Sequence, residues 1–327
     1  MAPDTVPGEA PLVVATSPLP LDVGAILGAS ATYREPAHRL GRDEVLDAVG
    51  EAEGLIALLT DPIDASLLAA APRLRVVANY AVGYDNVDVP AATARGIIVT
   101  NTPDVLTDAT ADFTFALLLA AARRLVEGDR LARSGTWTGW APGQHLGADI
   151  SRATLGLIGL GRIGRAVAAR ARGFAMEVLA LDRPGAAFVE GIARVALPEL
   201  LERADAVSLH CPLTPETRHI IDARALERMK PTAVLVNTAR GPCVDEEALV
   251  RALAAGQIAG AGLDVFEHEP RIHPGLVASP RVVLAPHAGS ATYTARRRMG
   301  EICARAIRAV LEGQRPPTIV NPEVATR

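Results

Sequence analysis

Three polar residues in the second half of the chain carry the chemistry that the sequence predicts: Arg240, Glu269 and His287. Each follows a short apolar run, and polar groups at strand ends face the ligand cleft of open α/β sheets. An arginine offers a fixed charge and a rigid fork of donors for a carboxylate. A histidine changes its charge near neutral pH and can protonate an oxygen that becomes negative. We therefore predict a site that holds a 2-oxo acid by its carboxylate and protonates its ketone oxygen while a hydride adds to the carbon.

Glu269 is the candidate partner of His287, since a carboxylate on the second ring nitrogen would fix the tautomer and raise the pKa of the imidazole. Each residue also has a simpler interpretation. An arginine at a strand end often forms a surface ion pair. A histidine often caps a helix or forms hydrogen bonds within a core, and an acidic residue before a proline often belongs to a turn. The presence of all three together favours the catalytic interpretation.

A glycine fingerprint predicts the source of the hydride. Gly159, Gly161 and Gly164 follow the apolar run 154–158 and open a helical pattern, and Asp182 ends the next apolar run. In such a motif the first glycine permits a tight turn, the second lets the backbone approach a pyrophosphate, and the third lets the helix pack closely on the strand. The helix N-terminus then presents N–H donors to the phosphates. The pattern predicts a dinucleotide site.

Asp182 indicates which dinucleotide binds there. It lies roughly 20 residues beyond the glycines, where a carboxylate accepts hydrogen bonds from the ribose hydroxyls and repels a 2′-phosphate. Arg183, beside it in the sequence, would tolerate that phosphate. We expect NAD as the cofactor, with NADH preferred and NADPH as the alternative.

Short apolar runs separated by helical patterns must position these residues. They occur at 12–15, 54–59, 74–78, 96–99, 154–158, 206–209, 233–236, 259–263 and 282–284. Such runs are typical of buried parallel strands. A helical pattern at 104–134 separates the runs before residue 100 from the runs after residue 153. A second helical pattern, at 291–312, follows the last run, and Ser290 is its expected N-cap.

The alternation predicts an α/β protein with two doubly wound parallel-sheet domains, Rossmann-like or flavodoxin-like, and an active cleft between them. Residues 1–102 together with 290–327 are predicted to form a discontinuous substrate-binding domain. Residues 103–289, including the connecting helix, are predicted to form the NAD-binding domain.

Composition narrows the partners to small molecules. The 327-residue chain has a net charge of −4 and its basic residues are scattered, so neither nucleic acid nor an anionic membrane is indicated. Lys230 is the only lysine, which excludes nearly every Schiff-base mechanism. The three cysteines lack metal-ligand spacing, so no metal is expected, and they suit a reducing compartment such as the cytoplasm. No leader pattern and no apolar stretch of about 18 residues is found.

These segments together resemble the D-isomer-specific 2-hydroxyacid dehydrogenases over nearly the whole chain. The matching motifs are Asn-x-x-Arg-Gly at 237–241, Asp-Val-Phe-x-x-Glu-Pro at 264–270 and Pro-His-x-Gly-Ser at 286–290. The resemblance implies that Arg240 binds the carboxylate and carbonyl of the substrate. It implies also that His287 is the acid that transfers the proton and that Glu269 is its partner.

The resemblance assigns further contacts. Asp264 would meet the carboxamide of the nicotinamide, and Thr110 would lie beside that ring, although Asp112 replaces the commoner Glu nearby. Backbone amides of Val82 and Gly83 would cradle the substrate carboxylate. Besides the glycines and Asp182, the expected cofactor-binding residues are Arg162, Ile163, Cys211, Pro212, Thr217, Thr238, Ala239, Arg240, His287 and Gly289.

Within that family the segment 133–142 is most similar to glyoxylate and hydroxypyruvate reductases. There an aromatic residue of this loop reaches the substrate pocket of the partner in a homodimer, which implies this role for Trp140; local packing of a tryptophan is the alternative. The expected function is NAD(H)-dependent reduction of glyoxylate or hydroxypyruvate. A phosphoglycerate-type dehydrogenase and a non-catalytic NAD-sensing binding module of the same fold are the alternatives.

Overall fold

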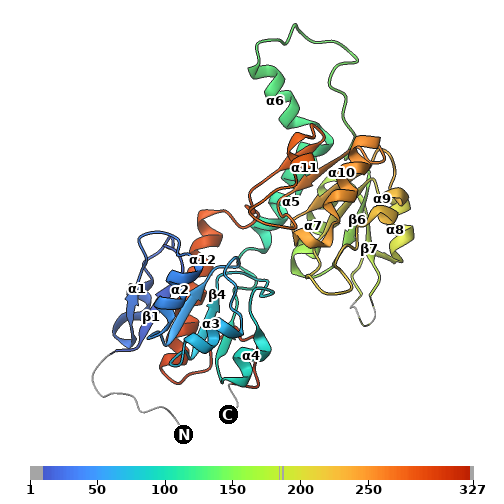
Figure 1. Ribbon diagram of the computed structural model, residues 1–327. Helices are drawn as coiled ribbons and strands as arrows, with labels where there is room; N and C mark the ends of the chain where they lie inside the picture. The colour runs from blue at the N-terminus through green and yellow to red at the C-terminus, as the bar shows by residue number, and fades with distance from the viewer. Residues whose placement is uncertain (1–9, 184, 186–187, 325–327) are drawn as a thin grey trace. The chain divides into compact units, whose positions relative to one another are not determined.

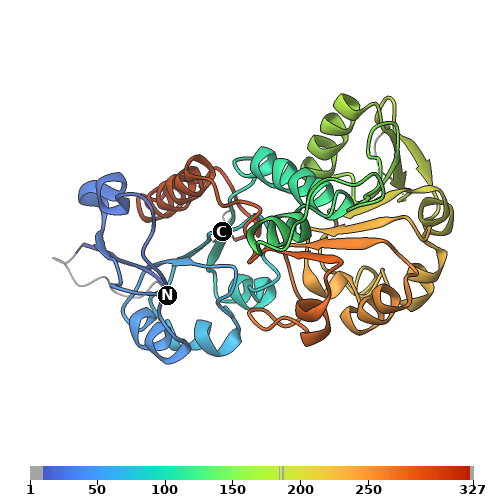
Figure 2. The ribbon, with the colours of Figure 1, turned by 90° about the horizontal axis from the view of Figure 1, so that it is seen from above.

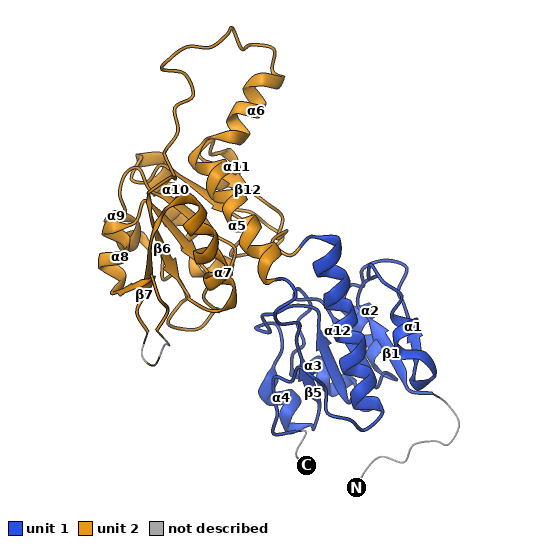
Figure 3. Cartoon of the chain, turned by 180° about the vertical axis from the view of Figure 1, so that it is seen from behind, with its two compact units in different colours: residues 1–106, 291–327 blue, residues 107–290 orange. Residues whose placement is uncertain are grey.

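The computed structural model describes residues 10–183, 185 and 188–324, and the chain divides into two compact units. Unit 1 comprises residues 1–106 and 291–327, and unit 2 comprises residues 107–290 (Figure 3). Each unit has its own parallel sheet and its own buried apolar core. The predicted α/β class with two parallel sheets is confirmed.

Unit 1 is built on a sheet with the strand order β2-β1-β3-β4-β5, in which all neighbouring strands are parallel. The strands are β1 Leu12–Ala15, β2 Thr32–Arg34, β3 Gly54–Ala57, β4 Val76–Asn79 and β5 Ile98–Thr100. The helices are α1 Val23–Leu27, α2 Arg42–Val49, α3 Ala65–Ala70, α4 Val89–Ala94 and α12 Tyr293–Leu311. Every residue of β3 and β4 is buried, as expected for central strands covered on both faces.

The helix α12 lies in unit 1, although it comes after the whole of unit 2 in the sequence. It packs against β3 and β4, and Gly54 makes room for it, because a Cβ at this position would lie 2.8 Å from Ile307 Cγ2. The predicted N-cap Ser290 is wrong. The hydroxyl of Thr292 caps the helix by accepting the N–H of Ala295, because this residue directly precedes the first helical turn.

Unit 2 contains a parallel sheet with the order β12-β11-β10-β9-β6-β7-β8. Figure 1 labels β6 and β7 of this sheet. Its strands are β6 Thr154–Ile158, β7 Glu177–Leu181, β8 Ala193–Val195, β9 Ala206–Leu209, β10 Val234–Asn237, β11 Gly260–Leu263 and β12 Val282–Leu284. The order reverses between β6 and β9, and ligands of such sheets bind at the carboxyl ends of the strands beside this reversal.

Helices cover both faces of the unit 2 sheet (Figure 2). They are α5 Thr107–Ala122, α6 Leu125–Arg133, α7 Arg162–Ala171, α8 Leu197–Arg203, α9 Ala223–Arg228, α10 Glu246–Ala255 and α11 Pro274–Ala278. The helix α5 packs on α7, β10 and β11, and its Thr114 Oγ1 lies 2.9 Å from Oγ1 of Thr238, just after β10.

The helical pattern at 104–134 forms two helices rather than one. Arg124 adopts left-handed backbone angles, with φ +54°, and this residue separates α5 from α6. Leu125 begins the second helix and is 63% exposed. No helix in the described part of the chain is long and apolar enough to cross a membrane.

Candidate active site

The carboxyl ends of β10, β11 and β12 bring the three predicted catalytic segments together. Asp264 follows β11, and its N–H donates to the carbonyl of Asn237 at the end of β10, at 2.9 Å. His287 follows β12, and its N–H donates to the carbonyl of Asp264, also at 2.9 Å. Neighbouring parallel strands thus extend their ladder into the loops and place segments that lie far apart in sequence side by side.

His287 and Glu269 form a direct pair. His287 Nδ1 lies 2.9 Å from Glu269 Oε2, and each side chain is about a quarter exposed, at 26% and 24%. Burial acts to raise the pKa of Glu269, but the hydrogen bond and the charge of His287 outweigh it, and the pKa lies below its ordinary value. With Nδ1 occupied by the carboxylate, Nε2 is the nitrogen left to serve a substrate.

Arg240 belongs to the same cluster. Its Nη1 donates to the carbonyl of Ala239 at 2.8 Å, and its own carbonyl accepts from Asn237 Nδ2 at 2.9 Å. The guanidinium lies close enough to Glu269 for its charge to lower the pKa of that carboxyl. A fixed positive charge therefore stands beside the histidine–carboxylate pair.

Asp264 is almost completely buried, at 1% exposure, and organises the loop that carries His287. Its two oxygens accept the N–H groups of Ala288 and Gly289 at 2.6 and 2.8 Å. Burial raises its pKa even though these bonds act in the opposite direction. The structure thus shows a positioning role for Asp264, and contact with a nicotinamide stays a prediction.

The glycine loop fits a dinucleotide. Gly159 has φ +106°, and a Cβ there would lie 2.6 Å from the carbonyl oxygen of His210. A Cβ on Gly164 would overlap the carbonyl oxygen of Gly159, whereas a Cβ on Gly161 would meet only open space. Gly161 is the N-cap of α7, so the open space lies at the positive end of this helix. An incoming pyrophosphate therefore finds room and donors at this end of the helix, where Arg162 and Ile163 form the first turn.

Asp182 lies directly after β7 with its side chain 64% exposed. Arg194 of β8 approaches it, with 3.8 Å between Nη1 and Oδ1. The carboxylate is accessible at the strand end where the ribose of a dinucleotide is expected.

Several other predicted cofactor residues surround the same sheet edge. Thr114 Oγ1 donates to the carbonyl of Thr110 and lies 2.9 Å from Thr238 Oγ1, which joins α5 to the end of β10. Thr217 Oγ1 donates to the carbonyl of Pro212 at 2.6 Å, in the loop after β9. Cys211, in that loop, is buried with its Sγ 3.9 Å from that of Cys243.

Val82 and Gly83 belong to unit 1 and follow β4. The carbonyl of Val82 accepts from Asn101 Nδ2 at 2.8 Å, and that of Gly83 accepts from Asn79 Nδ2 at 2.7 Å. These bonds fix the two carbonyls at the carboxyl end of the unit 1 sheet. The role of the Val82 and Gly83 amides in holding a carboxylate stays a prediction.

Trp140 does not join the cluster within this chain. It is 82% exposed and lies in the loop 134–147 after α6, which extends away from the sheet of unit 2 (Figure 1). We call α6 and this loop the arm.

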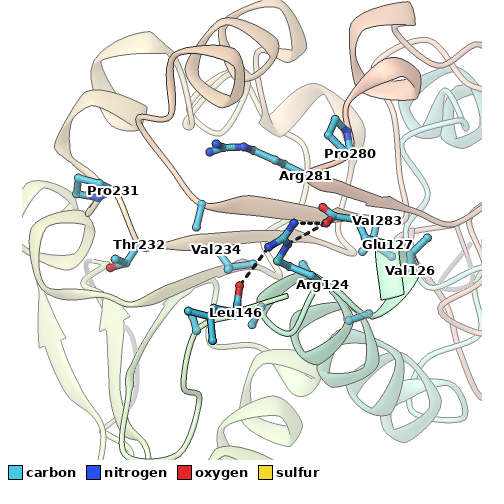
Figure 4. A pocket seen from close by; sticks show the side chains of 16 residues that line it. Arg124, Val126, Glu127, Leu146, Pro231, Thr232, Val234, Pro280, Arg281 and Val283 are labelled. Atoms are coloured by element: carbon cyan, nitrogen blue, oxygen red, sulfur yellow. Dashed lines mark hydrogen bonds and ion pairs between the residues drawn. The ribbon is translucent and has the colours of Figure 1, made fainter. Parts of the chain in front are cut away.

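A cavity of about 490 Å³ lies at the opposite, amino-terminal edge of the unit 2 sheet (Figure 4). Pro231, Val234 and Val283 line it, and Arg124, which pairs with Glu127 at 2.6 Å, lies at its side. Lys230 directly precedes the lining residue Pro231 in the sequence, and its Nζ lies 2.7 Å from Asp205 Oδ1. This edge does not contain the predicted catalytic residues.

Sequence reasoning missed a second histidine–carboxylate pair near the site. His219 Nε2 lies 2.6 Å from Glu267 Oε1, and the backbone of Glu267 contacts the buried Glu246. Glu267 stands two residues before Glu269, yet no spacing links it to His219, which comes from the loop after β9. Among the described residues, no cluster of three or more histidine, cysteine or acidic side chains could hold a metal.

Comparison with known proteins agrees with this geometry. A family model described as "D-isomer specific 2-hydroxyacid dehydrogenase, NAD binding domain" matches residues 115–289. A glyoxylate reductase of Thermococcus onnurineus is 52% identical over 89% of this chain and 89% of its own length. A glyoxylate reductase of Korarchaeum cryptofilum is 55% identical over 86% of each chain.

Solved structures extend the similarity to the whole fold. The crystal structure of a protein from Thermus thermophilus superimposes with a TM-score of 0.87 at 47% identity, covering 94% of this chain and 99% of that one. The sequence match and the structural match each include both units. The chain therefore belongs to the D-isomer specific 2-hydroxyacid dehydrogenases, which are NAD(P)-dependent oxidoreductases.

Proposed function

We propose that the protein reduces glyoxylate, and the related hydroxypyruvate, to the corresponding 2-hydroxy acid with NADH. The observation that carries the proposal is the pairing of His287 with Glu269 beside Arg240, at the sheet edge that also holds the glycine loop. The choice of glyoxylate rests on relatives that share about half of their residues with this chain and are named glyoxylate reductases.

Each of the three polar residues has a separate task in this reaction. Arg240 binds the carboxylate of the 2-oxo acid and orients its ketone. His287 donates a proton from Nε2 to the ketone oxygen as negative charge develops there. Glu269 accepts a hydrogen bond from the Nδ1–H group, which fixes the tautomer and favours the imidazolium. The dinucleotide, when bound at the glycine loop, supplies the hydride.

The assignment of the two units follows from these roles. We propose that residues 103–289 form the NAD-binding domain and that residues 1–102 with 290–327 form the substrate-binding domain. Support comes from the glycine loop in unit 2 and from Val82 and Gly83 at the carboxyl end of the unit 1 sheet. The preference for NADH is supported by the accessible carboxylate of Asp182.

The arm supports a homodimer. Trp137, Trp140 and Leu146 are 55%, 82% and 67% exposed on it, and exposed apolar groups that gather on one element mark an interaction surface. In this proposal the arm binds a second copy of the chain, and Trp140 contributes to the substrate pocket of that copy. The cysteines in the described residues are thiols, which supports a cytoplasmic location.

The test is a comparison of 2-oxo acids. NADH consumption is followed by absorbance with glyoxylate, hydroxypyruvate, pyruvate, phenylpyruvate and 3-phosphohydroxypyruvate at equal concentrations, and then repeated with NADPH. The proposal expects the highest kcat/KM for glyoxylate or hydroxypyruvate. If activity were highest with 3-phosphohydroxypyruvate, the protein would be a phosphoglycerate-type dehydrogenase. If NADH bound but no acid were turned over, the protein would be a non-catalytic NAD-sensing binding module.

A further inference from the structure

Glu267 and Glu246 form a reciprocal pair beside the candidate site. The N–H of Glu267 donates to Glu246 Oε1 at 2.9 Å, and the N–H of Glu246 donates to Glu267 Oε2 at 3.2 Å. His219 Nε2 lies 2.6 Å from the other oxygen of Glu267. Glu246 is 5% exposed and the side chain of Glu267 13%, so water competes little for these contacts.

This pair joins the two loops that carry the predicted catalytic residues. Glu267 lies in the loop 264–270 that contains Glu269, and Glu246 opens α10, shortly after Arg240 in the sequence. The backbones of the two loops also touch, since a Cβ on Gly241 would overlap the carbonyl group of Phe266. At this point the two loops pack backbone against backbone.

Consecutive peptide groups of the loop 264–270 point to opposite partners. The N–H of Phe266 donates to Glu269 Oε1 at 3.0 Å, and the next N–H, of Glu267, donates to Glu246. A rotation of the chain that breaks the Glu246 contact therefore also turns the donor that holds Glu269. The carboxylate that faces His287 is fixed through this one segment of backbone.

Burial raises the pKa of Glu246 above its ordinary value, and the charge of Glu267 adds to this rise. The Glu267 N–H and the charges of His273 and His268 act in the opposite direction. The loop that carries His219 is itself tied down, because the His219 N–H donates to the carbonyl of Pro242 at 2.8 Å. The two carboxyl groups thus stay together because each accepts an N–H of the other and His219 adds a third donor.

We propose that Glu267, held by Glu246 and His219, is a positioning residue that keeps Glu269 facing His287 and so sets how strongly His287 retains its proton. The proposal rests on the proposed function, because it assigns His287 the proton transfer. The proposal adds Glu267, Glu246 and His219 as residues that do not touch the substrate and affect the reaction only through the position of Glu269.

The experiment compares Glu267→Ala and Glu267→Gln with the control Glu247→Ala. Glu247 is in the same turn of α10 but is exposed and pairs with Arg251 and His273. We expect Glu267→Ala to lower kcat for glyoxylate roughly 10-fold to 100-fold with the Kd of NADH unchanged. Glu267→Gln keeps an oxygen for the Glu246 N–H and should restore part of the loss, and Glu247→Ala should resemble wild type.

A titration of His287 by NMR, without cofactor, gives a readout that is independent of turnover. We expect the pKa of His287 to fall in Glu267→Ala and to stay unchanged in Glu247→Ala. In a Glu269→Gln background, Glu267→Gln should have no further effect on this pKa or on the pH profile, because the partner through which it acts is gone.

Three results would overturn the inference: an unchanged His287 pKa in both Glu267 variants, effects of Glu267→Gln and Glu269→Gln that simply add, or equal losses in the Glu267 variants and Glu247→Ala. If wild-type protein turns over no 2-oxo acid, the proposed function fails instead. The His287 titration then still decides whether Glu267 positions Glu269.

Discussion

His287 and Glu269 show how two residues with ordinary individual interpretations acquire a specific chemistry from their separation. At 2.9 Å the carboxylate faces Nδ1 of the ring and leaves Nε2 as the nitrogen that can serve a substrate. The sequence could predict the two residue types and their partnership from motifs. Their roles in catalysis remain predictions that kinetic measurements must test.

Replacing His287 by Ala should lower kcat for 2-oxo acid reduction by roughly 10²–10⁴, the usual contribution of a general acid. The Kd of NADH should remain unchanged, because the glycine loop is untouched. Steady-state kinetics with NADH fluorescence titration measures both quantities. Turnover close to that of wild type would show that another group donates the proton.

Glu269→Gln should move the upper pH limit of rapid reduction to lower pH. Removing the carboxylate removes the charge that favours the imidazolium, so His287 loses its proton at lower pH. In the wild type the ionised partner is present at and above the ordinary pKa of a glutamate, and it is lost only as the pH falls through the lowered pKa of Glu269. If the pH profile of kcat/KM matched that of wild type, Glu269 would not be the partner that sets the protonation of the general acid.

Asp182→Ala should shift the ratio of kcat/KM for NADH over NADPH by roughly tenfold or more toward NADPH, since hydrogen bonds to a charged group contribute about 1.5–3 kcal/mol. Removing the carboxylate leaves the positive charge of Arg194, which approaches Asp182 to 3.8 Å, near the position expected for a 2′-phosphate. Arg183 provides a comparison: Arg183→Ala should not weaken the use of NADH. If the ratio of kcat/KM for NADH over NADPH stayed constant in Asp182→Ala, Asp182 would not contact the ribose of the dinucleotide.

At the scale of elements, the buried strands were predictable and the exposed ones were not. The strands β3 and β4 consist of fully buried residues and have a clear apolar signal, whereas β2 (Thr32–Arg34) and β8 (Ala193–Val195) are short edge strands with exposed positions. An edge strand is defined by its hydrogen bonds to one neighbour and requires no apolar run. The break at Arg124 was also missed, because left-handed backbone angles at an arginine leave no compositional signal.

The second layer of the site escaped prediction for a related reason. The contacts of Glu267 with Glu246 and His219 join three loops, and two of these contacts use backbone N–H groups. A backbone donor is the same at every residue, so the side-chain sequence does not show where it points. Only the paired strands β9, β10 and β11 bring these loops together.

The turn between β6 and α7 allows a sharp test with two glycines. Gly164→Ala should lower the free energy of unfolding by roughly 1–3 kcal/mol, because its Cβ would overlap the carbonyl oxygen of Gly159. Gly161→Ala should leave stability nearly unchanged, since its Cβ meets open space and its φ of −75° suits alanine. It should nonetheless weaken NADH binding roughly tenfold or more by occupying the approach of the pyrophosphate. Unfolding in urea and NADH titration measure the two effects, and unchanged affinity in Gly161→Ala would contradict the predicted site.

At the scale of the whole molecule, the two parallel sheets were predictable from the pattern of strands and helices. The alternation of apolar runs and helical patterns stops before the helical segment 104–134 and begins again at residue 154. The arm was not predicted as a projecting element. Trp140 suggested either local packing or contact with a partner's pocket, and its exposure within one chain argues against local packing.

The homodimer proposal predicts a mass in solution of twice 34.2 kDa by light scattering. Trp140→Ala should keep that mass and raise the KM for glyoxylate, because the proposed contact of Trp140 is with the substrate pocket. Trp137→Ala, from the same exposed loop, is the matched control and should leave KM unchanged. A fully active species of 34.2 kDa would exclude a site shared between copies.

The single lysine has a practical consequence for handling the protein. Lys230 pairs with Asp205 at the amino-terminal edge of the unit 2 sheet, the edge opposite the glycine loop and His287. A reagent that couples amines to a solid support or a fluorophore meets only one side-chain amine besides the terminal α-amine. Immobilisation through the Lys230 amine would present every molecule with its reactive edge turned away from the surface.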